Sequence, residues 1–441
     1  MPVKALLIST YELGHQPLHV ASPAAVLRGD GHDVRAGDLA VDPIDWDDVE
    51  WADAVAISVP MHTAMRLAVD VASRIKARFS DKPICLYGLY AGMSQGTTLG
   101  RVADRIIVGE YETALASWAN TLDSGVSREL IKSTFLLPAR DLLPPLDRYA
   151  KLESAGQERI VGYVEASHGC RHRCGHCPIP AIYDGLFRVV GADVVLDDIA
   201  QLVGMGAEHI TFGDPDFFNG PHHAMRILEE AHRQFPDLTF DITVKVEHIL
   251  KHRTLWGRVR AAGVVFAVSA FESMNDDILA ILDKGHDRQD MAEAVEIMRS
   301  VGIDIRPSWL PFTPWTTAED VVEMFRFVAE YDLPTDPIQF TIKLLIPEGS
   351  VLLKRPELTP YLGVYDHDRL TYEWVAIDSR AGKLVSRYCE HVDHSMRSNV
   401  DPSDLIRDLF AMALEAAELP PEPLEIGSFE GRPRLTEPWF C

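Results

Sequence analysis

The chain of 441 residues lacks several features that define common classes of protein. No stretch approaches the roughly 20 consecutive apolar residues that a membrane-spanning helix needs, and residues 1–9 read as a strand rather than a signal sequence. Basic residues are too few for a nucleic-acid partner, because 42 Lys and Arg stand against 66 Asp and Glu, a formal net charge of -24. We therefore expect a cytoplasmic protein with no membrane segment and no nucleic-acid ligand.

Cysteine is also scarce, and its distribution is uneven. Three of the six cysteines fall within one short loop, whereas the others are isolated, a pattern that favours a metal site in a reducing compartment over a disulfide framework. The six are Cys85, Cys170, Cys174, Cys177, Cys389 and Cys441.

The length and the apolar content, nearly half of the residues, predict two or three domains. Residues 1–124 alternate short apolar runs with helical patterns, which predicts a Rossmann-like, doubly wound parallel sheet of the cobalamin-binding type. Its strands are expected at residues 3–9, 33–38, 54–59, 84–88 and 105–109. Residues 125–157 lose this periodicity and read as a proline-stiffened linker.

A second alternating series spans residues 158–347 and predicts a partial (β/α)6 barrel with its chemistry at the carboxyl ends of the strands. Residues 348–441 read as a small mixed region that shapes the substrate pocket, with one helix beginning near Asp401. The six barrel strands are expected at residues 160–167, 209–212, 240–246, 264–269, 304–310 and 338–346.

The cysteine triplet follows the first expected barrel strand, in Ser167-His-Gly-Cys170-Arg-His-Arg-Cys174-Gly-His-Cys177-Pro. An ordinary [4Fe–4S] cluster takes four cysteine thiolates, whereas this loop offers three, so one iron would keep an open site.

The alternative is a zinc-stapled binding or scaffold protein without turnover, since three histidines interleave with the cysteines and zinc accepts mixed ligands. Structural zinc loops usually pair two ligand clusters, however, and no second cluster follows at suitable spacing. The histidines at positions 168, 172 and 176 are therefore interpreted as loop residues.

Cys-x3-Cys-x2-Cys after the first strand of a six-unit partial barrel resembles the radical S-adenosylmethionine (SAM) superfamily, over residues 160–346. The resemblance implies that SAM chelates the open iron and that one electron from an external flavodoxin- or ferredoxin-type reductant cleaves it to a 5′-deoxyadenosyl radical. That radical then removes a hydrogen atom from a small-molecule or peptide substrate.

The family often has Gly-Gly-Glu after the second strand to contact SAM, whereas this chain has Gly213-Asp214, and Asp214 could instead cap the next turn. Other polar residues fall where strands should end, and buried polar groups need partners, so a ligand-facing role is expected. These predicted SAM contacts are Lys245, Glu247, Ser269, Glu272, Arg306 and Ser308.

A doubly wound domain, a linker and then a radical barrel is similar to the cobalamin-binding branch of the superfamily, which makes methyl transfer the leading reaction. The Asp-x-His-x-x-Gly signature of a cobalt ligand is missing, and Asp30-Gly-His32 lacks the glycine. The alternative is a degenerate domain kept for packing. A tRNA-modifying relative is a second rival, disfavoured by the net charge. The predicted cobalamin contacts are Tyr11, His15, His62, Tyr90 and Glu110.

The last residues, Glu437-Pro-Trp-Phe-Cys441, resemble radical proteins with a Cys-Sec-Ala-Glu-Pro or Cys-Cys-Ala-Glu-Pro tail. Selenocysteine is encoded by a stop codon, so ordinary translation of such a gene would end at Cys441. This residue would then act in redox or selenium chemistry. Cys389 is a second candidate for a redox or substrate-site role, with simple burial as the alternative.

Overall fold

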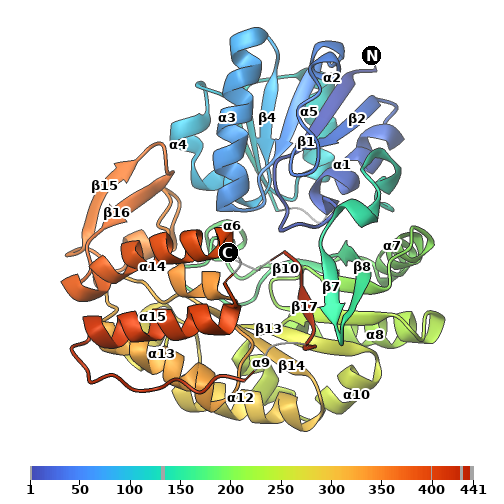
Figure 1. The fold of residues 1–441 in the computed structure, drawn as a ribbon. Helices are drawn as coiled ribbons and strands as arrows, with labels where there is room; N and C mark the ends of the chain where they lie inside the picture. Colours follow the sequence, from blue (N-terminus) through green and yellow to red (C-terminus); the bar gives the residue numbers. More distant parts are fainter. Residues whose placement is uncertain (1, 131–134, 399, 428–430, 438–441) are drawn as a thin grey trace.

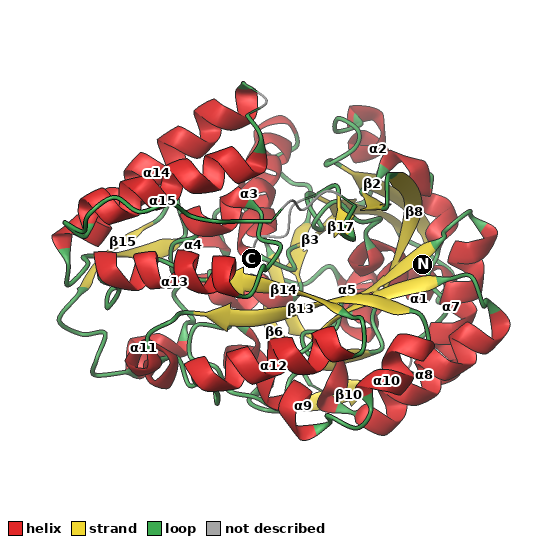
Figure 2. Cartoon of the chain, turned by 60° about the horizontal axis from the view of Figure 1, so that its bottom comes forward, coloured by secondary structure: helices red, strands yellow, loops and turns green. Residues whose placement is uncertain are grey.

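The computed structural model describes residues 2–130, 135–398, 400–427 and 431–437. Two sheets dominate it, a parallel sheet in the N-terminal part and a curled sheet below it that helices cover on its outer side (Figures 1 and 2). None of the described helices combines the length and the apolar character needed to cross a membrane.

The first sheet has the order β2-β1-β3-β4-β5-β6, with every neighbouring pair parallel. Apart from Lys4 at the start of β1, the central strands β1, β3 and β4 are buried because helices cover both faces. Helices α1 and α5 pack on one face, whereas α2 and α3 pack on the other. The strands are β1 (Lys4–Ser9), β2 (Asp33–Asp38), β3 (Ala54–Ser58), β4 (Ile84–Tyr87), β5 (Arg105–Gly109) and β6 (Gly125–Glu129), and the helices are α1 (Leu18–Gly29), α2 (Trp46–Trp51), α3 (His62–Arg78), η1 (Leu89–Met93), α4 (Gln95–Thr98) and α5 (Glu112–Thr121).

The doubly wound sheet is confirmed, and β2 and β5 have the expected bounds. Strand β6 was not expected, because it lies in the segment interpreted as a linker. It is an edge strand whose residues are only half-buried or exposed, so it carries no apolar run that the sequence could reveal.

The curled sheet has the order β14-β13-β12-β11-β8-β7-β17, in which β8 to β14 are parallel. Capping boxes at Asp287 and Thr317 fix the starts of α12 and α13. Its parallel strands are β8 (Gln157–Val164), β11 (His209–Phe212), β12 (Thr239–Thr243), β13 (Val264–Glu272) and β14 (Asp304–Trp309), and its helices are α7 (Ala192–Gly204), α8 (Pro221–Gln234), α9 (Val246–Lys251), α10 (Trp256–Ala261), α11 (Asp276–Ile281), α12 (Arg288–Ser300) and α13 (Ala318–Glu330).

The sixth barrel strand, expected at residues 338–346, is not a regular strand. Pro337–Thr341 forms the 3-10 helix η5, and the bridge between Phe312 and Lys343 is isolated. Pro337 stands in the first turn of η5, a position where proline is favoured because its fixed φ suits a helical turn, so the start of the expected strand forms a helical turn instead. The half-barrel therefore has five regular parallel strands among the described residues.

Several short elements lie at the β8 edge of the curled sheet and around the cysteine loop. Strands β7 and β17 extend the sheet at its open edge and run antiparallel to their neighbours. Strands β9 and β10 pair beside the cysteine loop. These elements are η2 (Arg140–Leu142), η3 (Leu146–Arg148), β7 (Lys151–Ser154), β9 (Ser167–Gly169), α6 (Ile179–Tyr183), β10 (Phe187–Val189), η4 (Phe217–Asn219) and β17 (Arg434–Leu435).

The C-terminal region contains η6 (Val351–Lys354), a hairpin of β15 (Leu362–Asp366) and β16 (Thr371–Trp374), and two helices, α14 (Ser379–Arg397) and α15 (Pro402–Ala416). Asp401 caps α15 as expected, accepting from the backbone N–H of Ser403. Helix α14 was missed, because its buried face is a narrow stripe in an otherwise polar segment.

Candidate functional site

The cysteine loop lies between β9 and α6, at the carboxyl end of the first barrel strand. Cys170 and Cys174 are buried and Cys177 is partly buried. The chain enters the loop through Gly169, whose φ is +73°. A Cβ at this position would lie only 2.4 Å from the Leu186 carbonyl oxygen. This position therefore requires glycine.

The three sulfur atoms do not converge on one point. A tetrahedral zinc ion would hold its thiolates about 3.8 Å apart, because Zn–S bonds are about 2.3 Å long. The three sulfur atoms do not all lie within 4.8 Å of one another. Separated thiols suit a polynuclear cluster in which each iron takes one sulfur. The donor set thus fits an iron–sulfur cluster better than a single ion.

Two buried lysines supply positive charge to the thiols. The Lys245 Nζ atom lies 3.7 Å from the Cys174 sulfur. Lys284 interacts electrostatically with Cys174 and Cys177 and pairs with Glu272 at 3.0 Å. Burial raises the pKa of Cys177 and Lys284 opposes this rise, so the lysine and a bound metal would both favour the thiolate.

Glu272 ends β13 in a left-handed conformation, with φ of +67°. Its carboxylate also lies 3.0 Å from His176 Nε2, so it ties the cysteine loop to the strand end. Burial alone would raise the pKa of Glu272, but Lys284 and His176 lower it well below its usual range. The carboxylate is therefore ionised at neutral pH.

Gly213 and Asp214 lie beneath the loop. Asp214 accepts hydrogen bonds from the Ala166 backbone N–H at 2.9 Å and from the Ser167 hydroxyl, and burial raises its pKa to about 7. A Cβ on Gly213 would lie 1.8 Å from the Tyr163 hydroxyl, which explains the glycine. Their contact with SAM stays a prediction.

The other predicted SAM contacts divide into two sets. Lys245, Glu247 and Glu272 gather around the cysteine loop, and the buried Ser269 hydroxyl has no hydrogen-bond partner among the described residues. Arg306 instead donates to the Pro433 carbonyl at 2.7 Å, and it lines with Ser308 a separate cavity of about 30 Å³. Leu435 and Glu437 close that cavity, so these two positions face the C-terminal segment.

A buried chain of alternating acids and histidines joins the first sheet to the barrel. The nitrogen–oxygen or oxygen–oxygen distances between successive members lie between 3.0 and 3.2 Å. Carboxylates raise the pKa of His168 well above its usual value despite the opposing effect of burial. Sequence reasoning missed this chain because its members come from distant segments with no common spacing. In order they are Glu12, His19, Glu165, His168, Glu110 and Tyr183.

The five predicted cobalamin contacts do not form one cluster. Tyr11 donates to Glu437 at 2.6 Å, and Glu110 belongs to the buried chain. His15 stacks on Tyr163 of β8, with ring centroids 4.8 Å apart, and burial lowers its pKa to about 4. These positions are engaged within the protein rather than in surface loops.

His62 and Tyr90 remain together at the carboxyl edge of the first sheet, with ring centroids 6.0 Å apart. The His62 Nε2 atom also lies 2.8 Å from the Arg369 carbonyl oxygen. His32 precedes β2 and its Nδ1 accepts from the Val3 N–H at 3.2 Å, so it lies at the amino edge of the sheet. The Asp30-Gly-His32 string is therefore on the wrong side for a ligand at the carboxyl edge.

Cys389 is exposed on α14, so the alternative of simple burial is wrong. Cys441 lies outside the described residues, and the selenoprotein-like tail stays a prediction.

A doubly wound sheet above a half-barrel, with a three-cysteine loop at the barrel mouth, defines the class of α/β iron–sulfur proteins. Residues 164–328 match the model of the Radical SAM superfamily. This match and the relatives described next identify a radical SAM enzyme that uses a [4Fe–4S] cluster and SAM.

Two curated relatives are methyl-transferring enzymes by name. The hopanoid C-2 methylase of Rhodopseudomonas palustris (strain TIE-1) is 22% identical over 375 residues, covering 81% of this chain and 70% of that protein. The bacteriochlorophyllide d C-12(1)-methyltransferase of Chlorobaculum tepidum is 27% identical over 195 residues, covering 43% of this chain and 42% of that protein.

Two solved structures share the fold over most of the chain. The cobalamin-dependent SAM radical enzyme OxsB with aqua-cobalamin has a TM-score of 0.70 and 15% identity, covering 90% of this chain and 67% of that one. The radical SAM methyltransferase TsrM from Kitasatospora setae has a TM-score of 0.57 and 16% identity, covering 76% and 71%. The expected order of a doubly wound parallel sheet followed by a half-barrel is confirmed.

Proposed function

We propose that this radical SAM enzyme is a cobalamin-dependent methyltransferase of a small molecule. One observation carries the proposal: Glu110, directly after β5, contacts His168 of β9, the strand that leads into the cysteine loop, at 3.0 Å. The carboxyl edge of the first sheet, where doubly wound folds bind cofactors, therefore faces the cluster loop.

Cys170, Cys174 and Cys177 would hold the cluster, and SAM would occupy its open iron. When bound, the cluster supplies the electron that cleaves SAM to methionine and a 5′-deoxyadenosyl radical, and cobalamin supplies a methyl carrier. Lys245 and Lys284 stabilise the thiolates. Asn219 donates to the Cys170 sulfur at 3.4 Å and so orients it.

Cobalamin would lie over the carboxyl edge of the first sheet, next to His62 and Tyr90. The turn after β4 passes close to its neighbour, since Gly88 has φ of +109° and no side chain against the Val59 carbonyl. With His32 at the opposite edge, no histidine of the Asp-x-His-x-x-Gly type would reach the cobalt.

The substrate class follows from the relatives. OxsB and TsrM are crystallised with cobalamin, one TsrM structure contains tryptophan as substrate, and the two curated relatives are named for methylation of small molecules. The C-terminal region would shape the pocket for a small molecule or a short peptide. An external flavodoxin- or ferredoxin-type reductant, available in the reducing cytoplasm, would supply the electron.

The test is anaerobic reconstitution with iron and sulfide, followed by addition of hydroxocobalamin and removal of unbound cofactor. We expect four irons and one cobalamin per chain, release of 5′-deoxyadenosine from SAM under reduction, and transfer of the labelled SAM methyl group to bound cobalamin. Release of the nucleoside without cobalamin retention would contradict methyl transfer while leaving the radical chemistry intact. Stoichiometric zinc without iron would contradict both.

A further inference from the structure

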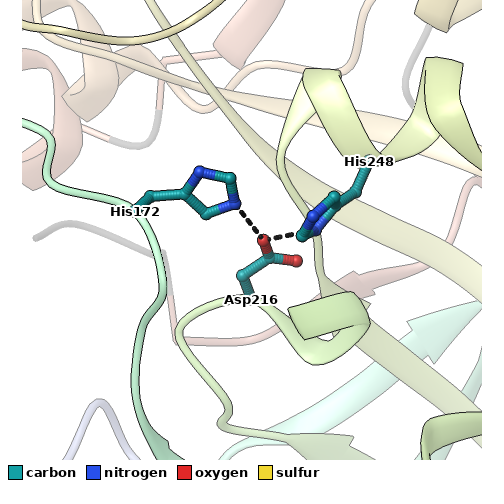
Figure 3. A group of neighbouring side chains, drawn as sticks. All are labelled: His172, Asp216 and His248. Carbon is teal, nitrogen blue, oxygen red and sulfur yellow. Dashed lines mark ion pairs between the residues drawn. The ribbon is translucent and has the colours of Figure 1, made fainter. Parts of the chain in front are cut away.

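A second group of ligating side chains lies behind the cysteine loop. It consists of His172 from the loop, Asp216 from the turn after β11 and His248 from α9 (Figure 3). In the part of the chain that the structure describes, this is the one group of three or more such residues whose ligand atoms all lie within 4.8 Å of one another. Three elements distant in sequence thus meet at one point.

Asp216 and His248 are buried, His172 is partly buried, and both rings converge on one oxygen atom. Asp216 is 0% exposed, and its Oδ2 atom lies 2.7 Å from His248 Nδ1 and 3.4 Å from His172 Nε2. Figure 3 shows both rings directed at this carboxylate. The two ring centroids are 4.9 Å apart, so their nitrogens approach the same space from different sides.

The same three atoms have no hydrogen-bond partner of acceptable geometry among the described residues. Buried polar atoms are nearly always satisfied, so three such atoms facing one another indicate a missing ligand. A cation could take all three atoms as ligands, and its positive charge would be balanced by the Asp216 carboxylate, whereas an anion would be repelled by it.

The surrounding contacts are those of a metal site. The other Asp216 oxygen accepts from the Phe218 N–H at 3.2 Å, and His172 Nδ1 lies 3.5 Å from Glu247. A carboxylate on the far nitrogen of a ligating histidine fixes its tautomer and leaves the other nitrogen free for the metal. The Glu247 side chain is 42% exposed, which gives an ion a route from solvent.

We propose that His172, Asp216 and His248 bind one divalent transition-metal ion of the zinc type, separate from the iron–sulfur cluster. Two imidazoles and one carboxylate form a donor set that zinc accepts, with water in the fourth position. The ion pins the cysteine loop to the turn after β11. That turn continues into η4, where Asn219 holds the Cys170 sulfur, so the ion stabilises one cluster ligand indirectly.

The experiment starts from protein whose cluster has already been reconstituted, so that the cysteines are occupied. One equivalent of zinc is added, loosely bound metal is removed with a weak chelator, and zinc and iron are counted by elemental analysis. We expect one zinc beside four irons per chain. X-ray absorption at the zinc edge should show only nitrogen and oxygen neighbours, because the proposed site contains no sulfur.

Variants locate the ion. His248→Ala and Asp216→Asn should lose the zinc and keep the iron, and Glu247→Gln should weaken zinc binding about tenfold. His391→Ala removes a partly exposed histidine that lies 3.2 Å from Asp408, a histidine–aspartate pair at the surface, and should keep both metals. Iron content and the far-UV circular dichroism spectrum report folding, and His172→Gln replaces any variant that fails to fold.

Sulfur scattering at the zinc edge would overturn the proposal, as would zinc that the weak chelator removes completely from the unmodified enzyme. Unchanged zinc content in both His248→Ala and Asp216→Asn would overturn it as well. In that case Asp216 forms ion pairs with protonated His172 and His248, and these pairs hold the loop in place without a metal.

Discussion

The first sheet and the half-barrel are both built from parallel βα units, yet they bring different groups to the space between them. The first sheet contributes carboxylates and histidine, and these lie in a continuous series of close contacts with barrel residues. The barrel contributes the three thiols of the cysteine loop and the lysines beside them. The paired acids and histidines form a structural joint, whereas the thiols and lysines would hold the cluster.

The largest expected effect separates the barrel cysteines from the others. Cys174→Ala should remove most of the iron and abolish 5′-deoxyadenosine release, because one of three cluster ligands is lost. Cys389→Ala, at an exposed position on α14, should leave iron content unchanged. Iron analysis and nucleoside assay of both variants test this, and a Cys174→Ala protein with full iron would refute the cluster assignment.

The joint between the two regions is expected to be the next most sensitive feature. His168→Ala leaves Glu110 and Glu165 buried beside each other without their shared cation, and should lower the free energy of unfolding by about 3–5 kcal/mol. Glu415→Gln, in an exposed pair with Arg387, should cost no more than about 1 kcal/mol. Chemical denaturation measures the free energy of unfolding of both variants. Equal losses would show that the buried joint stabilises the protein no more than a surface ion pair does.

The same joint predicts a pH window for stability. Carboxylates raise the pKa of His168, so its contribution is complete below about pH 6.5 and is lost as pH rises through the folded value. The two histidines lower the pKa of Glu165 despite burial, so its contribution is complete above about pH 4.3 and is lost on acidification. Melting temperature should therefore peak between these limits, and His168→Gln should flatten the alkaline side of the profile.

The smallest expected effects compare two glycines of the barrel. Gly213→Ala should destabilise the protein by about 1–3 kcal/mol, because the new Cβ would overlap the Tyr163 hydroxyl. Gly257→Ala, in α10 with open space around it, should stabilise by about 0.5–1 kcal/mol. Thermal melts of both variants check the sign, and a stabilising Gly213→Ala would contradict the close approach.

Much of the fold could be predicted because its strands are continuous apolar runs between helical patterns. Strand β6 escaped prediction because an edge strand has no such run, and η5 forms where a strand was expected because Pro337 favours a helical turn directly before the apolar run. The two-residue strand β17 was also not predicted. Arg306 donates to the carbonyl of Pro433, the residue just before β17, so the C-terminal segment occupies a side chain that was expected to contact SAM.

In the site, the spacing of the three cysteines predicts a metal centre, and the structure places all three in one loop at the carboxyl end of the first barrel strand. Their supporting groups could not be predicted, since Asn219 lies 49 residues from Cys170 and Lys245 lies 71 residues from Cys174. Such pairs form only when the strands are arranged side by side, and no local pattern encodes them.

The two-residue strand β17 has a consequence for handling the protein. Arg434 and Leu435 pair with β7, the strand that otherwise ends the curled sheet in the described structure. An uncovered strand edge offers its free backbone groups to another chain and promotes aggregation. A purification tag or truncation that displaces these two residues should therefore make the protein prone to self-association at high concentration.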